Sequence, residues 1–183
     1  GVGKPELPLV LDLFTTTKDT KLEGLINASG TETLVSSRCP PNHAAFYEND
    51  GKRVNRLVIC RRHVDLSDLD AVWEVLAHEA THIMQACRGG AVLADTQMPR
   101  TYRELQTMAP HYAKLINAAY SSGDQRLEAE AFWMELQAPQ RVLEMFRTSC
   151  AARLGLAPVG SASERPVSAP AAPPSLISLP ALR

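Results

Sequence analysis

The chain has 183 residues, of which 45% are hydrophobic and 21% charged, and its formal net charge at pH 7 is −1. This length and composition are typical of one globular domain with a sizeable core. A net charge so near zero provides no electrostatic footprint for nucleic acid, and no apolar run is long enough to cross a bilayer, so we expect neither a nucleic-acid partner nor a membrane span.

Strands and one short helix are expected in the first sixty residues. Leu7 to Phe14 is apolar and fits a strand or a short helix, and a short helix is expected through Leu22 to Ile26. Three later segments have the composition of strands: Thr31 to Ser37, Ala44 to Tyr47 and Val54 to Cys60. The last two flank the turn Asn49-Asp50-Gly51 and should form a hairpin. The sequence therefore predicts a small antiparallel sheet ahead of the helices.

Residues 67–88 are predicted to form an amphipathic helix. Its apolar positions recur at spacings of three and four: Leu69, Val72, Leu76, Ala80, Ile83 and Cys87. Ser67 with Asp70 resembles a capping box at the start of this helix, with the acid shortened to Asp. Arg88 followed by two glycines indicates where the helix should end.

The same helix carries the run His78-Glu79-Ala80-Thr81-His82, in which two histidines are four residues apart. At 3.6 residues per turn they lie about 40° apart around the helix, so both can point a ring nitrogen at one metal ion. Both lie well away from the centre of the apolar stripe. Glu79 projects from the flank of the pair, where a carboxylate can take a proton from water without being a ligand. The alternative is two histidines that hydrogen-bond to neighbouring groups and bind no metal.

Three further helical segments are expected after the motif. An apolar stripe runs from Tyr102 to Ala119, and Pro110 must kink or split it. Gly123-Asp124 is typical of a stop followed by an N-cap, and the helix that starts there carries Glu128. Pro139 begins a last helix. The expected fold class is α+β, with the small antiparallel sheet preceding a mostly helical part.

A third protein ligand is expected, because catalytic zinc usually has three protein ligands and one open position. The HExxH run, followed on a later helix by Glu128 and Ala131 in a Glu-x-x-Ala setting, resembles the gluzincin branch of the zincin metallopeptidases, and small bacterial or phage members in particular. The resemblance implies a zincin-like fold in which His78, His82 and Glu128 hold Zn²⁺. Glu130 is the rival third ligand. It lies about 200° from Glu128 around a helix, so only one of the two can face the metal.

One position departs from the family pattern. Several such families have Asp or Asn four residues after the ligand Glu, where it supports a zinc histidine, and here that position is Phe132. The group that orients His78 or His82 must then come from elsewhere. The candidates are Glu74, Asp95 and backbone carbonyls.

The resemblance implies a zinc-dependent peptidase in which Glu79 is the catalytic base and the substrate is a peptide or protein. Related enzymes often stabilise the oxyanion with Tyr or His, and the candidates here are Tyr112, His111, Tyr120 and His63. In zincins an edge strand borders the cleft, so by analogy one of the strands spanning 44–60 would accept an extended peptide. A non-catalytic zinc-binding interaction or regulatory domain, such as a degenerate peptidase, is the alternative, and a hydrolase of a non-peptide bond ranks last.

Four cysteines leave the compartment open. Two disulfides, Cys39 with Cys60 and Cys87 with Cys150, are the pairing that we favour among three connectivities, and they would permit an extracytoplasmic site. Buried free thiols in a cytosolic protein fit about as well. No signal peptide is seen in the sequence, and nothing in it indicates an oligomeric state.

Residues 156–183 are rich in Pro, Ala and Ser, and we expect them to be disordered or to form a tether. Residues 1–155 would then be the zincin-like metallopeptidase domain. The alternative for the tail is that its last apolar residues dock on that domain: Leu176, Ile177, Leu179 and Leu182.

Overall fold

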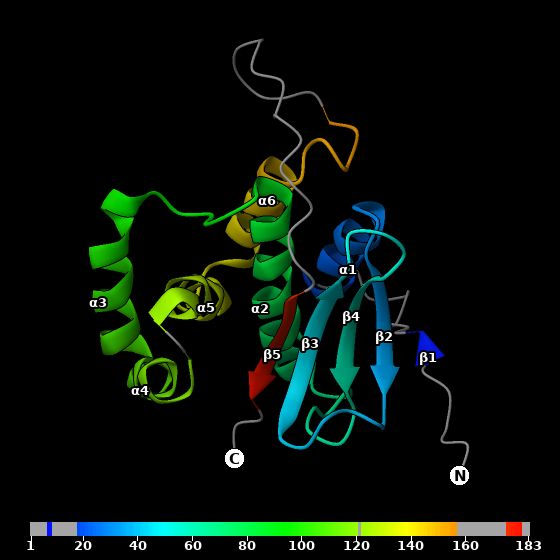
Figure 1. Ribbon diagram of the computed structural model, residues 1–183, viewed down its shortest axis with the longest axis horizontal. Helices are drawn as coiled ribbons and strands as arrows, with labels where there is room; N and C mark the ends of the chain where they lie inside the picture. The colour runs from blue at the N-terminus through cyan, green and yellow to red at the C-terminus, as the bar shows by residue number, and fades with distance from the viewer. Residues whose placement is uncertain (1–6, 9–17, 121, 157–174, 181–183) are drawn as a thin grey trace.

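The computed structural model describes residues 7–8, 18–120, 122–156 and 175–180 (Figure 1). Within these ranges the chain is α+β, as predicted, with a sheet on one side and helices packed against it and beyond it. The strands are β1 Leu7–Pro8, β2 Glu32–Ser36, β3 His43–Asn49, β4 Asn55–Cys60 and β5 Ser175–Pro180. The α-helices are α1 Lys18–Ala28, α2 Leu69–Arg88, α3 Met98–Met108, α4 Pro110–Ala119, α5 Ser122–Glu135 and α6 Pro139–Ser149, and a 3₁₀ turn spans Asp95–Gln97.

The sheet is mixed, and the expectation of an antiparallel sheet was wrong for one pair of strands. The predicted hairpin is present as β3 and β4, and the Asp50 carboxylate closes its turn by accepting hydrogen bonds from the backbone N–H groups of Lys52, Arg53 and Val54. The strand order is β1-β2-β4-β3-β5, and β2 runs parallel to β4. The alternation of apolar and polar residues in a strand indicates which face of the strand is buried, but not which strand lies beside it. The sequence therefore did not indicate that β2 pairs with β4 in parallel.

The Cys39–Cys60 disulfide follows directly from the parallel pair. Ser36 at the end of β2 lies opposite Cys60 at the end of β4, and Cys39 follows Ser36 by three residues. The second disulfide joins Cys87 in the last turn of α2 to Cys150 at the end of α6. Both predicted pairings are therefore confirmed, and they are compatible with an extracytoplasmic site.

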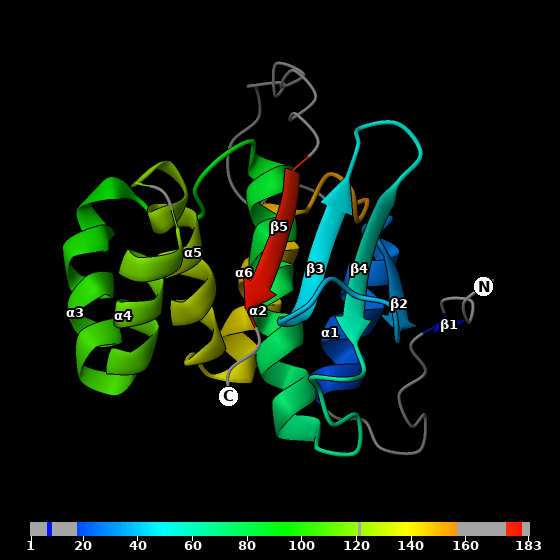
Figure 2. The ribbon, with the colours of Figure 1, turned by 60° about the horizontal axis from the view of Figure 1, so that its bottom comes forward.

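Helix α2 lies at the centre of the molecule. Its N-cap is Asp68, whose carboxylate accepts hydrogen bonds from the N–H groups of Asp70 and Ala71, so the predicted cap at Ser67 was one residue early. Gly89 ends the helix with φ +75°, as predicted. Helix α1 and strand β3 pack on one side of α2, and α5 and α6 pack on the other (Figure 2). The histidine face of α2 thus points away from the sheet and toward a second layer of helices.

The remaining helices largely match the predictions. Pro110 divides the predicted stripe into α3 and α4. A proline cannot continue a helix from the residues before it, but it is tolerated in the first turn of a helix, where a backbone N–H has no partner within the helix. Helix α5 begins at Ser122, slightly before the predicted cap at Asp124. None of the described helices is both long and apolar enough to cross a bilayer.

The chain ends are described only in part. Of the apolar segment Leu7 to Phe14, residues 7–8 form β1 beside β2, and the rest lies outside the described residues. In the C-terminal tail, residues 175–180 form β5, antiparallel to β3, whereas 157–174 and 181–183 lie outside the described residues. For residues 175–180 the backbone is thus that of a docked strand.

The two disulfides should differ in their effect on stability. The Cys87–Cys150 bond closes a loop of sequence separation 63, and the Cys39–Cys60 bond closes one of 21. Because a cross-link reduces the entropy of the unfolded chain more for a longer loop, replacing Cys87 and Cys150 by Ala should lower the free energy of unfolding by about 4 kcal/mol, and replacing Cys39 and Cys60 by about 3 kcal/mol. Urea unfolding of both double variants measures this. Equal stability of the variants and the parent would contradict it.

Candidate metal centre

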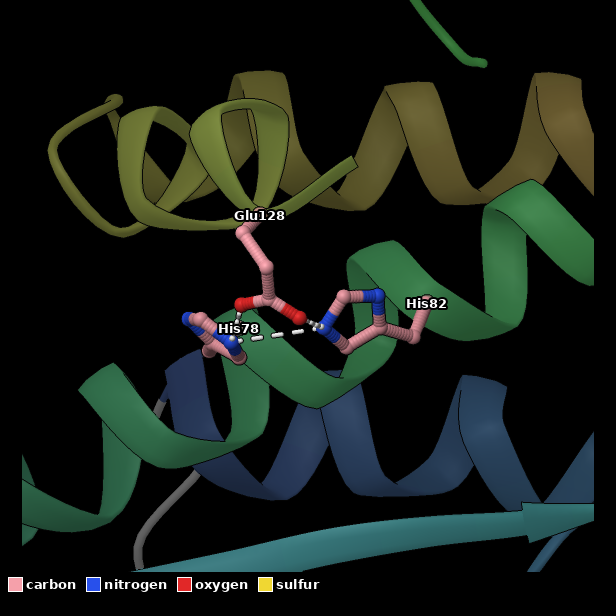
Figure 3. Close-up of side chains that lie close together, drawn as sticks. All are labelled: His78, His82 and Glu128. Carbon is pink, nitrogen blue, oxygen red and sulfur yellow. Dashed lines mark hydrogen bonds and ion pairs between the residues drawn. The ribbon is translucent and has the colours of Figure 1, made fainter. Parts of the chain in front are cut away.

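Three side chains from α2 and α5 converge on one point: His78 and His82 from α2, and Glu128 from α5 (Figure 3). The Nε2 atoms of the two histidines are 3.3 Å apart. Oε2 of Glu128 lies 3.1 Å from Nε2 of His78, and its Oε1 lies 3.1 Å from Nε2 of His82. These residues, the candidate triad, are 0%, 1% and 2% exposed. Sequence analysis therefore identified three side chains that the fold brings together.

The spacing of the triad suits a tetrahedral ion. Ligand atoms at about 2.0–2.2 Å from zinc in a tetrahedron lie about 3.3 to 3.6 Å from one another. The nitrogen and oxygen atoms of the triad lie 3.1 to 3.3 Å apart. Two imidazoles and one carboxylate are also the donor set of a catalytic zinc site that keeps one position open. The residues present could therefore hold a metal ion.

One face of α5 provides most of the contacts to His78. Glu128, Phe132 and Glu135 follow one another at intervals of four and three residues, so they share a face of the helix. The ring of Phe132 packs edge-on against the His78 ring, with 4.6 Å between their centroids. Oε2 of Glu135 accepts a hydrogen bond from Nδ1 of His78 at 2.9 Å. His78 therefore has an acid from α5 as its hydrogen-bond partner, three residues beyond Phe132.

His82 is oriented by Gln85, three residues further along the same helix. The side-chain amide of Gln85 donates to the carbonyl of Leu127 and to the carboxylate of Glu130, both at 3.0 Å. Its oxygen must therefore accept a hydrogen bond from Nδ1 of His82, at 2.8 Å. With Nδ1 acting as donor in both histidines, each ring can present the Nε2 lone pair to the centre of the triad once the proton on Nε2 is lost.

The other predicted supports lie elsewhere. Glu74 is exposed, and Asp95 forms an ion pair with Arg126. Sequence analysis therefore missed both Gln85 and Glu135. Their only sequence signals are spacings of three residues from His82 and seven from Glu128, which place each on the right face of its helix.

Glu130, the rival ligand, has a different role. Its carboxylate accepts hydrogen bonds from the N–H groups of Val92 at 2.9 Å and Leu93 at 2.6 Å, and from the amide of Gln85. It is fully buried and fastens the segment that follows α2 to α5. Its effect on the triad is indirect, through Gln85 and His82.

Glu79 is buried, and its two carboxylate oxygens have no hydrogen-bond partner among the described residues. Burial raises its pKa to about 7, while the charges of His82 and His78 oppose the rise. A carboxyl group with a pKa near neutrality is well matched to accepting and returning a proton. An unpaired buried carboxylate is costly, and a catalytic role is one explanation for it.

The triad itself binds protons tightly. Burial opposes the charged form of His78, but hydrogen bonds to Glu128 and Glu135 raise its pKa to about 10. Burial would raise the pKa of Glu128, but the two histidines hold it well below its ordinary value. A cation binding here must displace protons, as expected for histidine ligands in general.

Of the four oxyanion candidates, Tyr120 lies nearest to this chemistry. Burial raises its pKa, and the charges of Glu128 and Glu79 together with a hydrogen bond to Glu128 add to the effect, so its hydroxyl is neutral and donates to a member of the triad. Tyr112 is buried and its hydroxyl donates to Oε1 of Glu135 at 3.1 Å. The other two candidates, His63 and His111, are exposed.

Comparison with known proteins adds nothing to these observations. No protein-family model, curated protein or solved structure matches this chain. The chemistry of the triad, of Glu79 and of the groups behind them is therefore the basis for inferring a function.

Replacing Glu130 by Gln should cost stability and leave metal binding in place. The change removes the charge that accepts two backbone N–H groups, and a loss of about 2 kcal/mol in the free energy of unfolding is expected. Urea unfolding and zinc content after dialysis measure the two effects. Loss of zinc with unchanged stability would instead identify Glu130 as a ligand.

Glu135→Gln should weaken zinc binding about 10- to 100-fold, because the neutral amide polarises His78 less than the carboxylate does. Competition with a chromophoric chelator measures the affinity. Tyr112→Phe, which removes only a hydroxyl bonded to Glu135, should have a smaller effect. Glu144→Gln, on the exposed face of α6, is the control. An affinity for Glu135→Gln equal to that of the control would show that Glu135 does not support the site.

Proposed function

We propose that the protein is a zinc-dependent peptidase of gluzincin type, in which His78, His82 and Glu128 hold the ion. The observation that carries the proposal is the convergence of three ligand atoms within 4.8 Å of one another, next to a buried glutamate that has no described partner. The three ligand atoms could hold a cation, and the buried glutamate could act as a base. Two histidines with a purely structural role would need neither feature.

The roles of the side chains follow from their surroundings. When bound, zinc supplies a Lewis acid that makes water nucleophilic near neutral pH and polarises a carbonyl group. Glu79 accepts a proton at its carboxylate and returns it to the leaving amine, for which burial has tuned its pKa to about 7. The neutral hydroxyl of Tyr120 donates a hydrogen bond to the developing oxyanion. Glu135 and Gln85 keep the imidazoles turned toward the ion.

The alternative is a non-catalytic zinc-binding domain with an interaction or regulatory role. The observation that favours it is burial, because the triad and Glu79 are between 0% and 2% exposed and a substrate must reach them. The observation that favours catalysis is again Glu79, because a structural zinc site has no use for an unpaired buried acid.

Zinc content and peptide cleavage together test the proposal. Glu79→Gln should retain about one zinc per chain and lose cleavage about 10²- to 10⁴-fold, because it removes the base and no ligand. Glu128→Gln should lose zinc during dialysis against a weak chelator. Metal analysis and mass spectrometry of a mixture of unstructured peptides measure both, with Glu74→Gln on the exposed side of α2 as the control.

The outcomes separate the alternatives. Cleavage that survives Glu79→Gln would remove this residue from the mechanism. A zinc-loaded wild-type chain that cleaves no peptide would favour the non-catalytic domain. A chain that binds no zinc would contradict both.

A further inference from the structure

The two strands that were expected to accept a peptide have no unpaired edge. Strands β3 and β4 lie in the interior of the described sheet: β4 pairs with β2 and β3, and β3 pairs with β4 and β5. An extended peptide adds to a strand only where that strand has an unpaired edge. The expectation by analogy that a strand within 44–60 accepts the substrate is therefore wrong for the sheet as described.

The candidate triad also faces away from the sheet. It lies where α5 packs against α2, whereas β3 packs on the other side of α2 (Figure 2). A substrate of the proposed peptidase must therefore reach the triad from the helical side of the molecule. A side chain that contacts the triad and also extends to the surface would mark the route.

Tyr120, the residue that follows α4, is such a side chain. Its hydroxyl donates a hydrogen bond to Glu128 and lies close enough to Glu79 to be affected by the charge of that carboxylate. Tyr120 is half-buried. The other described side chains that hydrogen-bond to the triad or stack against it are all buried: Gln85, Phe132 and Glu135. Among these contacts, Tyr120 alone connects the triad to the surface.

The side chain of Tyr120 can turn without a change in the backbone around it. The N–H of Tyr120 donates to the carbonyl of Ile116 at 3.3 Å, and its carbonyl accepts a hydrogen bond from the amide of Gln125 at 3.1 Å. A rotation about the Cα–Cβ bond moves the ring and leaves both of these hydrogen bonds in place. Phe132 and Glu135 are buried on α5, so they cannot leave the triad unless that helix moves.

We propose that Tyr120 covers the entrance to the site and is the side chain that the substrate displaces, so that the substrate reaches the triad at the end of α4, beside α5. This inference rests on the peptidase proposed above. With the ring in place, the triad and Glu79 are between 0% and 2% exposed. When the ring turns, its hydroxyl leaves Glu128 and can donate to the oxygen of a bound carbonyl group. The substrate thus replaces the hydrogen bond that its entry breaks.

A thiol placed at position 79 reports whether the site can be reached. All four cysteines of the chain are in disulfides, so Glu79→Cys introduces a single thiol. Its reaction with methyl methanethiosulfonate, a small uncharged reagent, is followed by mass spectrometry in the full-length protein without metal. The rate is compared between chains with and without Tyr120→Ala. The matched control is Tyr102→Ala, which removes an exposed ring from α3.

Tyr120→Ala should raise the rate of this reaction at least 10-fold over both the parent and the Tyr102→Ala control, because it removes the ring that covers the site. Tyr120→Phe keeps the ring but removes the hydrogen bond to Glu128, so its rate should be intermediate. Equal rates for Tyr120→Ala and the control would overturn the inference. The measurement needs neither zinc nor cleavage, so its result does not depend on whether the protein is a peptidase.

The dependence of the rate on urea separates a local opening from unfolding. Turning one side chain exposes little surface, so the rate for Tyr120→Ala should change little at low urea concentrations. A thiol that is reached only by unfolding would react at a rate that rises with urea as steeply as unfolding itself does. That result would overturn the inference, and the comparison holds even when Tyr120→Ala lowers the stability of the chain.

Cleavage by zinc-loaded chains with Glu79 intact then separates the two proposals. Faster thiol labelling of the Tyr120→Ala chain, together with peptide cleavage by the wild type, supports both. Faster labelling with no cleavage by any chain overturns the peptidase and leaves the entrance standing. Cleavage by the wild type with equal labelling overturns the entrance and leaves the peptidase standing.

The kinetics of Tyr120→Phe test whether the hydroxyl passes from Glu128 to the substrate. The value of kcat should fall about 10²- to 10³-fold, because the donor to the oxyanion is lost. KM should not rise, because the ring is no longer bonded to Glu128 and entry becomes easier. An unchanged kcat with a raised KM would overturn this transfer of the hydroxyl.

Discussion

The packing of α5 against α2 is the contact on which the rest of the site depends. It removes two imidazoles and several carboxylates from water, and a buried charge is tolerated only where it is paired. The fold meets this demand through one face of α5, where Glu128 bridges both histidines and Glu135 holds the outer nitrogen of His78. Glu79 is the exception, since the same burial leaves its carboxylate without a described partner. The described helix contact thus brings together a group that could hold a cation, next to a buried acid without a described hydrogen-bond partner.

How well the sequence predicted each feature of the site depended on whether that feature arises within one helix or from the packing of two helices. The pairing of His78 with His82 depends on the geometry of one helix, so their spacing alone predicted it. The choice of Glu128 over Glu130 needed the rotation of α5 about its axis, which the sequence constrains only through its apolar stripe. Glu135 and Gln85 could not be assigned, because their partners depend on how two helices pack. In the sequence, each of these two residues is indistinguishable from an ordinary polar residue on a helix surface.

The sheet shows the same limit at the level of topology. Alternation predicted the strands β2, β3 and β4, and the turn at Asp50 predicted which two of them form a hairpin. The order in which they pair is determined by the chain's path after β2, and the pattern of a strand carries no information about it. The disulfides were predicted more easily than the order, because four cysteines allow few pairings. The strand formed by residues 175–180 was the hardest feature to predict, because the composition of residues 157–174 gives no information about the short uncharged segment that follows them.

Burial also determines how well Glu79 could serve the proposed function. Its pKa is raised chiefly because water is excluded from it, so an opening that admits water to the site would lower that pKa. Under the proposed function, Glu79 would then be a weaker base. A substrate that enters the site would therefore have to exclude water from this carboxyl group, so that the acid stays in dry surroundings while it accepts a proton.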